Sequence, residues 1–98
     1  MRQSGKSYAH PLVVLVAAAN DQAKLRIGVA AGRTVGNAVK RNRAKRLLRS
    51  AMQTLISTVV PGWDLVLIAR PSVVSSDSFE VREALLTLLR RAELTIAS

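Results

Sequence analysis

The apolar residues of this chain form two continuous runs and one alternating run, and these patterns predict three strands. Residues 12–19 form a continuous apolar run, typical of a strand that is covered on both faces. Residues 24–31 alternate, with Leu25, Ile27, Val29 and Ala31 on one face and Lys24, Arg26, Gly28 and Ala30 on the other. A short turn beginning at Asn20 predicts an antiparallel hairpin between these two strands. Residues 64–70 form a third apolar strand, which Pro71 ends.

Gly28 lies in the middle of the alternating strand. Since glycine has no side chain, we expect a gap on its face, where a partner could approach the backbone closely.

Two helices complete the pattern. Thr34 is a candidate N-cap for a helix over residues 35–60, which Pro61-Gly62 ends. Asp77 and Glu80 have capping-box spacing and predict a second helix over residues 78–92. Its apolar stripe comprises Val81, Ala84, Leu85, Leu88, Leu89 and Ala92. The order strand, strand, helix, strand, helix predicts one α+β domain over residues 1–98, a two-layer sandwich of a small sheet and two helices. Residues 1–10 are a loop or an edge strand.

Composition narrows the class of protein further. The 98 residues include no cysteine, which excludes a disulfide framework and a cysteine metal cluster. The longest apolar run is strand-sized, and the basic N-terminus with a short apolar stretch is a poor signal peptide, so we expect a cytoplasmic protein.

Charge is the strongest compositional signal. The formal net charge is +9, and residues 22–63 contain nine Lys and Arg residues without one acid. A one-sign stretch inside a folded domain indicates an anionic partner, with nucleic acid ahead of an acidic membrane surface.

A helical wheel divides the first helix into two faces. One side gathers Ala44, Leu47, Leu48, Ala51, Met52, Leu55 and Val59, and would pack on the sheet. The other side forms a basic ridge of Asn42, Arg43, Lys45, Arg46 and Arg49, with Lys40 and Arg41 at its shoulders.

Three features of this basic ridge favour a ligand over a merely solvated face. Like charges one turn apart, such as Arg43 and Arg46, have no Glu partners. Arginine dominates, and its planar guanidinium binds phosphate with two hydrogen bonds. The cations also crowd the N-terminal half of the helix, where the helix dipole is already positive, and a bound polyphosphate would relieve this conflict.

The stretch "RIGVAAGRTVGNAVKRNRAKRLLR", residues 26–49, resembles the signature of the bacterial ribonuclease P protein component. The flanks "GKSYAHPLVVLV" and "DLVLIARP" also fit, as does the amphipathic last helix, so the resemblance covers nearly the whole chain. It implies a small, mostly antiparallel sheet with a left-handed β-α-β crossover over residues 28–65, as in the second domain of a small-subunit ribosomal protein. From the residues alone, a right-handed crossover would be expected.

The resemblance also implies a function. The family protein assists a catalytic RNA, which holds the active site and removes the 5′ leader of precursor tRNA by Mg²⁺-dependent phosphodiester hydrolysis. The RNA and the precursor tRNA are then the partners, rather than DNA or a membrane. The positions that match the family's RNA-binding motif are Arg33, Lys40, Arg41, Asn42, Arg43, Lys45, Arg46 and Arg49.

The leader is expected in a cleft on the sheet face that points away from the helices. Strand alternation makes Val14 and Val16 candidates, with Tyr8 as a nearby aromatic residue for base stacking. Core packing is an equal alternative for the valines, and packing over a bare sheet edge is an equal alternative for Tyr8. Family members begin with one more basic helix, which would form a wall of this cleft and which precedes the stretch matched here by Gly5-Lys6-Ser7. The sequence begins at Met1, only four residues before this stretch. A late start codon, trimming or true absence of the helix would each account for this difference from the family.

Other chemistry has weak support in the sequence. His10 is the only histidine, no nucleophile–base pair is visible, and the six acids are scattered, so neither a protein-borne catalytic site nor a protein metal site is expected. The rival functions are a generic RNA-binding, DNA-binding or ribosomal protein, and a peripheral membrane protein. We rank the membrane protein last, because the apolar face of the basic helix is needed for the sheet.

Overall fold

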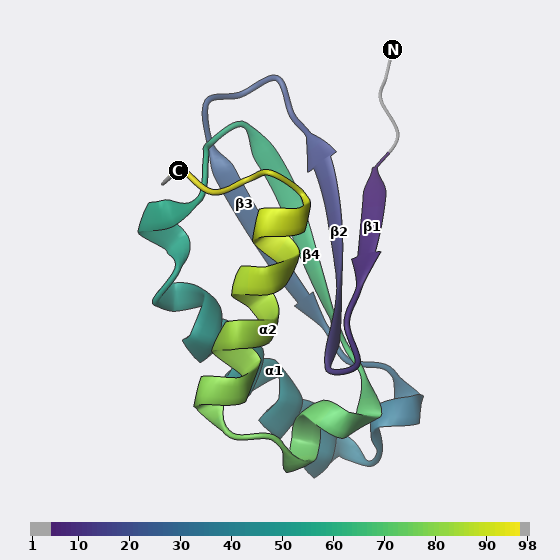
Figure 1. Cartoon of the computed structure of the whole chain (residues 1–98). Helices are drawn as coiled ribbons and strands as arrows, with labels where there is room; N and C mark the ends of the chain where they lie inside the picture. Colours follow the sequence, from purple (N-terminus) through teal and green to yellow (C-terminus); the bar gives the residue numbers. More distant parts are fainter. Residues whose placement is uncertain (1–4, 97–98) are drawn as a thin grey trace.

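The computed structural model describes residues 5–96 and has two layers, a mixed four-stranded sheet and two helices on one of its faces (Figure 1). The strands are β1 (Lys6–Ala9), β2 (Val13–Ala19), β3 (Leu25–Ala30) and β4 (Trp63–Ala69), in the order β1-β2-β4-β3. The helices are α1 (Ala38–Gln53) and α2 (Ser78–Arg91), with short 3-10 turns η1 (Arg33–Val35), η2 (Ile56–Thr58) and η3 (Pro71–Ser75). The predicted α+β sandwich is confirmed, and β1 shows that the N-terminal segment supplies an edge strand.

The predicted hairpin between the second and third strands is wrong. β4 lies between them, antiparallel to β2 and parallel to β3. Gly62, just before β4, binds both ends of the turn that joins β2 to β3. The Asn20 N–H donates to the Gly62 carbonyl at 2.9 Å, and the Gly62 N–H donates to the Lys24 carbonyl at 2.8 Å. The physical reason is burial, because the two most apolar strands take the central places and the alternating β3, which includes Arg26 and has no fully buried residue, takes an edge.

The connection from β3 through α1 to β4 is therefore a crossover between neighbouring parallel strands. Seen from the helix side with both strands pointing upward, β4 lies to the left of β3, which makes the crossover left-handed (Figure 1). This agrees with the resemblance and not with the general preference for right-handed crossovers.

Helix α1 is shorter than predicted at its N-terminal end. Thr34 lies in η1, and Gly36 then adopts a φ of 136°, which interrupts the helical path. Asn37 is the N-cap, and its side chain accepts a hydrogen bond from the Lys40 N–H at 3.0 Å.

The C-terminal end of α1 is also earlier than predicted, at Gln53 instead of Val60. The hydroxyl of Thr54 donates to the Ala51 carbonyl and that of Thr58 to the Leu55 carbonyl, both at 2.7 Å. These local bonds compete with the helical pattern, and η2 follows. Leu55 and Val59 are nevertheless buried, so the apolar stripe continues beyond the helix.

The core lies between the sheet and the helices. The predicted capping box of α2 is present, and Ala92, last in its apolar stripe, is half-buried while the other five are buried. On β2, Val13, Leu15 and Ala17 are buried, whereas the residues between them are only half-buried. The expectation that this strand is covered on both faces is therefore wrong, because both helices pack on the same side of the sheet (Figure 1).

Candidate nucleic-acid interface

The basic ridge lies on the side of α1 that faces away from the core. Asn42, Arg43, Arg46 and Arg49 are exposed, and Lys45 is half-buried. Ala44, Leu48, Ala51 and Met52 fill the opposite side, and Leu47 is half-buried between the two. The wheel is therefore confirmed for the residues inside the helix.

These cations have no acidic partners within residues 5–96. The two ion pairs of this region join Arg26 to Asp64 and Arg82 to Glu83, and neither includes α1. The first turn of α1 has no acidic residue either, so its helix dipole and its side chains are both positive at this end. Such a surface is arranged for an anionic ligand.

The cationic side chains of α1 nevertheless differ in whether hydrogen bonds hold them to the rest of the fold. The Arg43 Nε donates to the Val74 carbonyl at 3.1 Å, which ties α1 to η3. Arg41 is half-buried and its Nη1 donates to the Gly36 carbonyl at 3.2 Å. Arg46 makes no side-chain hydrogen bond to the rest of the described chain, and Lys40 and Arg33 are exposed beside the helix start. Arg46, like Asn42, Lys45 and Arg49, is thus a ridge residue that no side-chain hydrogen bond ties to the described fold.

The outer face of the sheet, which we define by Val14, Val16, Gly28, Ala30, Val66 and Ile68, is apolar and uncovered by the helices (Figure 1). Val66 and Ile68 are 39% and 37% exposed, unusually high for apolar strand residues. Val14 and Val16 lie on this face, as predicted, because they pair with Ile68 and Val66.

Tyr8 does not lie on this face, and its predicted place in the cleft is wrong. It pairs with Leu15, and residues directly opposite in an antiparallel pair point to the same side. Leu15 is fully buried under the helices, and Tyr8 is half-buried against the same core. The strand register, which the sequence did not reveal, placed the ring there.

One end of the outer face carries an ion pair that sequence reasoning missed. The Arg26 Nε and Nη2 donate to the two oxygens of Asp64 at 2.8 and 2.9 Å. The Asn20 side chain donates to Asp64 Oδ1 at 2.9 Å. The bonds from Arg26 and then Asn20 lower the pKa of Asp64 to about 2, and Asp64 raises the pKa of Arg26. The only signal in the sequence was that both residues lie in strands.

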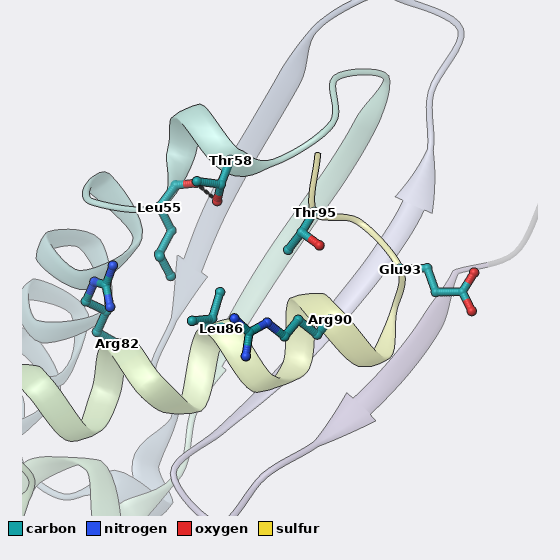
Figure 2. Close-up of a pocket in the computed structure, with 7 residues that line it drawn as sticks. All are labelled: Leu55, Thr58, Arg82, Leu86, Arg90, Glu93 and Thr95. Carbon is teal, nitrogen blue, oxygen red and sulfur yellow. Dashed lines mark hydrogen bonds between the residues drawn. The ribbon is translucent and has the colours of Figure 1, made fainter. Parts of the chain in front are cut away.

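A cavity of about 670 Å³ opens elsewhere, between α2 and the segment that follows α1 (Figure 2). Leu55 and Leu86 form its apolar part, while the Arg82 Nε donates to the Thr54 hydroxyl at 3.2 Å. The Glu93 carboxylate points away from the other lining residues (Figure 2). None of the described residues that line it is a binding residue predicted from the sequence, and Arg82 is already held by Thr54 and Glu83.

The described residues contain neither a cluster of metal ligands nor a membrane-spanning helix. His10 Nδ1 accepts from the Leu12 N–H at 3.1 Å and so shapes the turn between β1 and β2. Within residues 5–96, no three His, Cys, Asp or Glu side chains gather as a metal site would require. In the same residues, no helix has the length and apolar character needed to cross a membrane.

An arginine-rich helix packed on a small mixed sheet, with no acidic partner for its cations among residues 5–96, defines an α+β nucleic-acid-binding protein. Comparison with known proteins identifies the family. The family model described as Ribonuclease P matches residues 1–93, so the chain belongs to the ribonuclease P protein family. It is the protein subunit of a tRNA-processing endoribonuclease, as predicted.

Curated relatives extend this assignment across bacteria. The ribonuclease P protein component of Brevibacillus brevis is 40% identical over 93 residues, covering 94% of this chain and 74% of the relative. That of Herpetosiphon aurantiacus is 33% identical, covering 96% of this chain and 76% of the relative. These relatives are thus longer than the sequence studied.

Solved structures agree with the fold. The RNase P protein of Thermotoga maritima matches with a TM-score of 0.79 and 32% identity, over 89% of this chain and 83% of that one. The Staphylococcus aureus RNase P protein gives a TM-score of 0.78 and 26% identity, over 92% and 83%.

Proposed function

We propose that this subunit docks on the ribonuclease P RNA through α1 and holds the 5′ leader of precursor tRNA across its outer sheet face. The observation that carries the docking is the basic ridge, which has no acidic partner in the described part of the chain. Arg43, Lys45, Arg46 and Arg49 would meet phosphates, and Asn42 could orient an RNA group or a metal-bound water. Arg33, Lys40 and Arg41 would extend the contact at the helix start.

The leader position is supported by the character of the outer face. Its middle is apolar, and it ends in Arg26 on β3 and in Arg70 after β4. Single-stranded RNA binds to such surfaces with its bases on apolar or flat groups and its phosphates near cations. Val14 and Val16 would contact the leader there.

Catalysis would belong to the RNA. Mg²⁺ bound to the RNA subunit would supply the hydrolytic chemistry, since the described acids of this chain are dispersed and form no ligand cluster. The chain itself would position substrate and neutralise phosphates. The compartment would be the cytoplasm, where precursor tRNA is processed in bacteria.

Family membership disfavours a ribosomal or DNA-binding role, and the packing of α1 disfavours a membrane role. Ala44, Leu48 and Met52, which a membrane-surface helix would need free, are buried in the core.

Reconstitution tests the proposal. The purified protein with its cognate RNA should cleave precursor tRNA at low Mg²⁺ faster than the RNA alone. Arg46→Ala should reduce the stimulation, whereas Arg90→Ala, which removes the same charge from α2, should leave it nearly unchanged. No stimulation by the unmodified protein would contradict the proposed function.

A further inference from the structure

Gly28 occupies the middle of β3 on the outer face of the sheet. It is exposed, pairs with Val66 of β4, and lies between Arg26 and Ala30 on the same side of the strand. It is therefore a glycine in regular strand structure, where glycine is usually disfavoured because it loses more conformational freedom than other residues.

The fold itself does not require glycine here. Gly36 and Gly62 are the glycines with positive φ, and Gly28 has ordinary extended backbone. A Cβ atom built on Gly28 would meet no heavy atom within 4 Å, whereas one on Gly5 would lie 3.2 Å from the Ala17 carbonyl oxygen. An alanine would thus fit at position 28 without displacing any other group.

The missing side chain creates a step in the outer face. β2 and β4 carry Val14, Val16, Val66 and Ile68, while β3, which is next to β4, carries Gly28 and Ala30 after Arg26. The outer side of β3 is consequently lower, with Val66 and Ile68 as a wall beside it. A flat ring laid on the Gly28 backbone would have its edge against Val66.

Arg26 stands two residues from Gly28, at the end of this step. Asp64 binds its Nε and Nη2, which fixes the plane of the guanidinium. A guanidinium has five N–H donors, so three remain for an acceptor on a ligand. A flat apolar floor beside a fixed donor group is suited to an unpaired nucleobase and its phosphate.

We propose that Gly28 is the floor of a binding position for one unpaired nucleobase of an RNA strand, with Arg26 donating to the adjacent phosphate. This inference rests on the proposed passage of the leader over the outer face. It names β3, at the sheet edge, as the strand that determines how closely the RNA approaches, because any side chain at position 28 would lift the base from the backbone.

The test uses the holoenzyme reconstituted from the full chain and its RNA. Affinity is measured for precursor tRNA and for the same tRNA without its leader, and the ratio is the leader advantage. Gly28→Val should reduce this advantage by about five-fold or more, the loss of one base contact. Binding of the RNA subunit should stay unchanged.

The Tm of the variants separates binding from folding. Gly28→Ala and Gly28→Val should have a Tm equal to or above that of the unmodified protein, since the added Cβ meets no heavy atom within 4 Å and the chain loses less freedom on folding. Gly32→Ala is the matched control: its Cβ also meets nothing within 4 Å, but it lies in the loop after β3. It should leave the leader advantage unchanged, with a Tm equal to or above that of the unmodified protein.

The inference is overturned if Gly28→Val keeps the full leader advantage, or if both Gly28 variants lower the Tm, which would show that the glycine serves the fold. If the unmodified holoenzyme has no leader advantage, the proposed role of the outer face fails, and the inference fails with it. That outcome is distinguishable, because it does not depend on any variant.

Discussion

Arg26 and Asp64 join β3 to β4 through two parallel hydrogen bonds of 2.8 and 2.9 Å between the guanidinium and the carboxylate. The two residues face each other in the parallel register, so the pair links the edge strand to the central strand. Both groups are solvent-accessible, and the carboxylate is the one whose ionisation changes at acidic pH.

Asp64 should make stability depend on pH. Its pKa is about 2 in the folded chain and near 3.9 when unfolded, so ionised Asp64 stabilises the fold above about pH 4. This contribution should be lost as the pH falls through 2. Asp64→Asn should therefore lower the Tm at pH 7, with the difference shrinking between pH 4 and 2. Asp21→Asn, in the neighbouring turn, is the control; a pH-independent difference for Asp64→Asn would argue against the ion pair.

Asn37, and not Thr34, should stabilise the start of α1. Asn37→Ala removes the side-chain oxygen that accepts from the Lys40 N–H and should cost about 1 kcal/mol. In a domain of this size that is a fall in Tm of roughly 4–8 °C. Thr34→Ala should change the Tm little. A larger effect at Thr34 than at Asn37 would indicate that Thr34 is the N-cap of the helix.

Arg46 and Arg43 should behave differently, although both are exposed cations of the basic ridge. Arg46→Ala should weaken RNA-subunit binding while the Tm stays the same, because Arg46 makes no side-chain hydrogen bond to the rest of the described chain. Arg43→Ala should weaken binding and also lower the Tm, since it removes the bond to the Val74 carbonyl. Thermal denaturation with RNA-binding titrations measures both; unfolding of Arg46→Ala would make Arg46 a structural residue.

Salt should weaken the complex with the RNA subunit steeply. Four to six phosphate contacts correspond to a slope of about −3 to −5 in the logarithm of the association constant against that of salt concentration. Arg46→Ala should make the slope less steep by about 1. A flat salt response of the unmodified protein would contradict phosphate binding by α1.

Tyr8 should act in folding and not in leader binding. Its ring packs on the helix side of the sheet with Leu15, so Tyr8→Ala should lower the Tm while the leader advantage of the holoenzyme is kept. Val14→Asn, on the outer face, should instead reduce the leader advantage. A loss of leader advantage in Tyr8→Ala, at a temperature where the variant is folded, would indicate that Tyr8 contributes to leader binding after all.

Local patterns in the chain were enough to predict three of the four strands, both helices and the buried side of each helix. These properties depend on local periodicity, and so the apolar stripe of α2 and the basic ridge of α1 could be predicted. The motif in residues 26–49 likewise sufficed for the family. The ends of α1 were less predictable, because Gly36 and Thr54 use backbone conformations and local hydrogen bonds that compete with the apolar pattern.

The order of the strands in the sheet could not be predicted in this way. Both β3 and β4 are apolar enough to pair with β2. The pairing with β4 depends on burial across the whole sheet, to which residues distant in sequence contribute. That choice also brought Arg26 against Asp64 and Gly28 against Val66, and the pairing with β1 turned Tyr8 toward the helices. The side of the sheet on which a residue lies follows from register, and register is a property of two strands together.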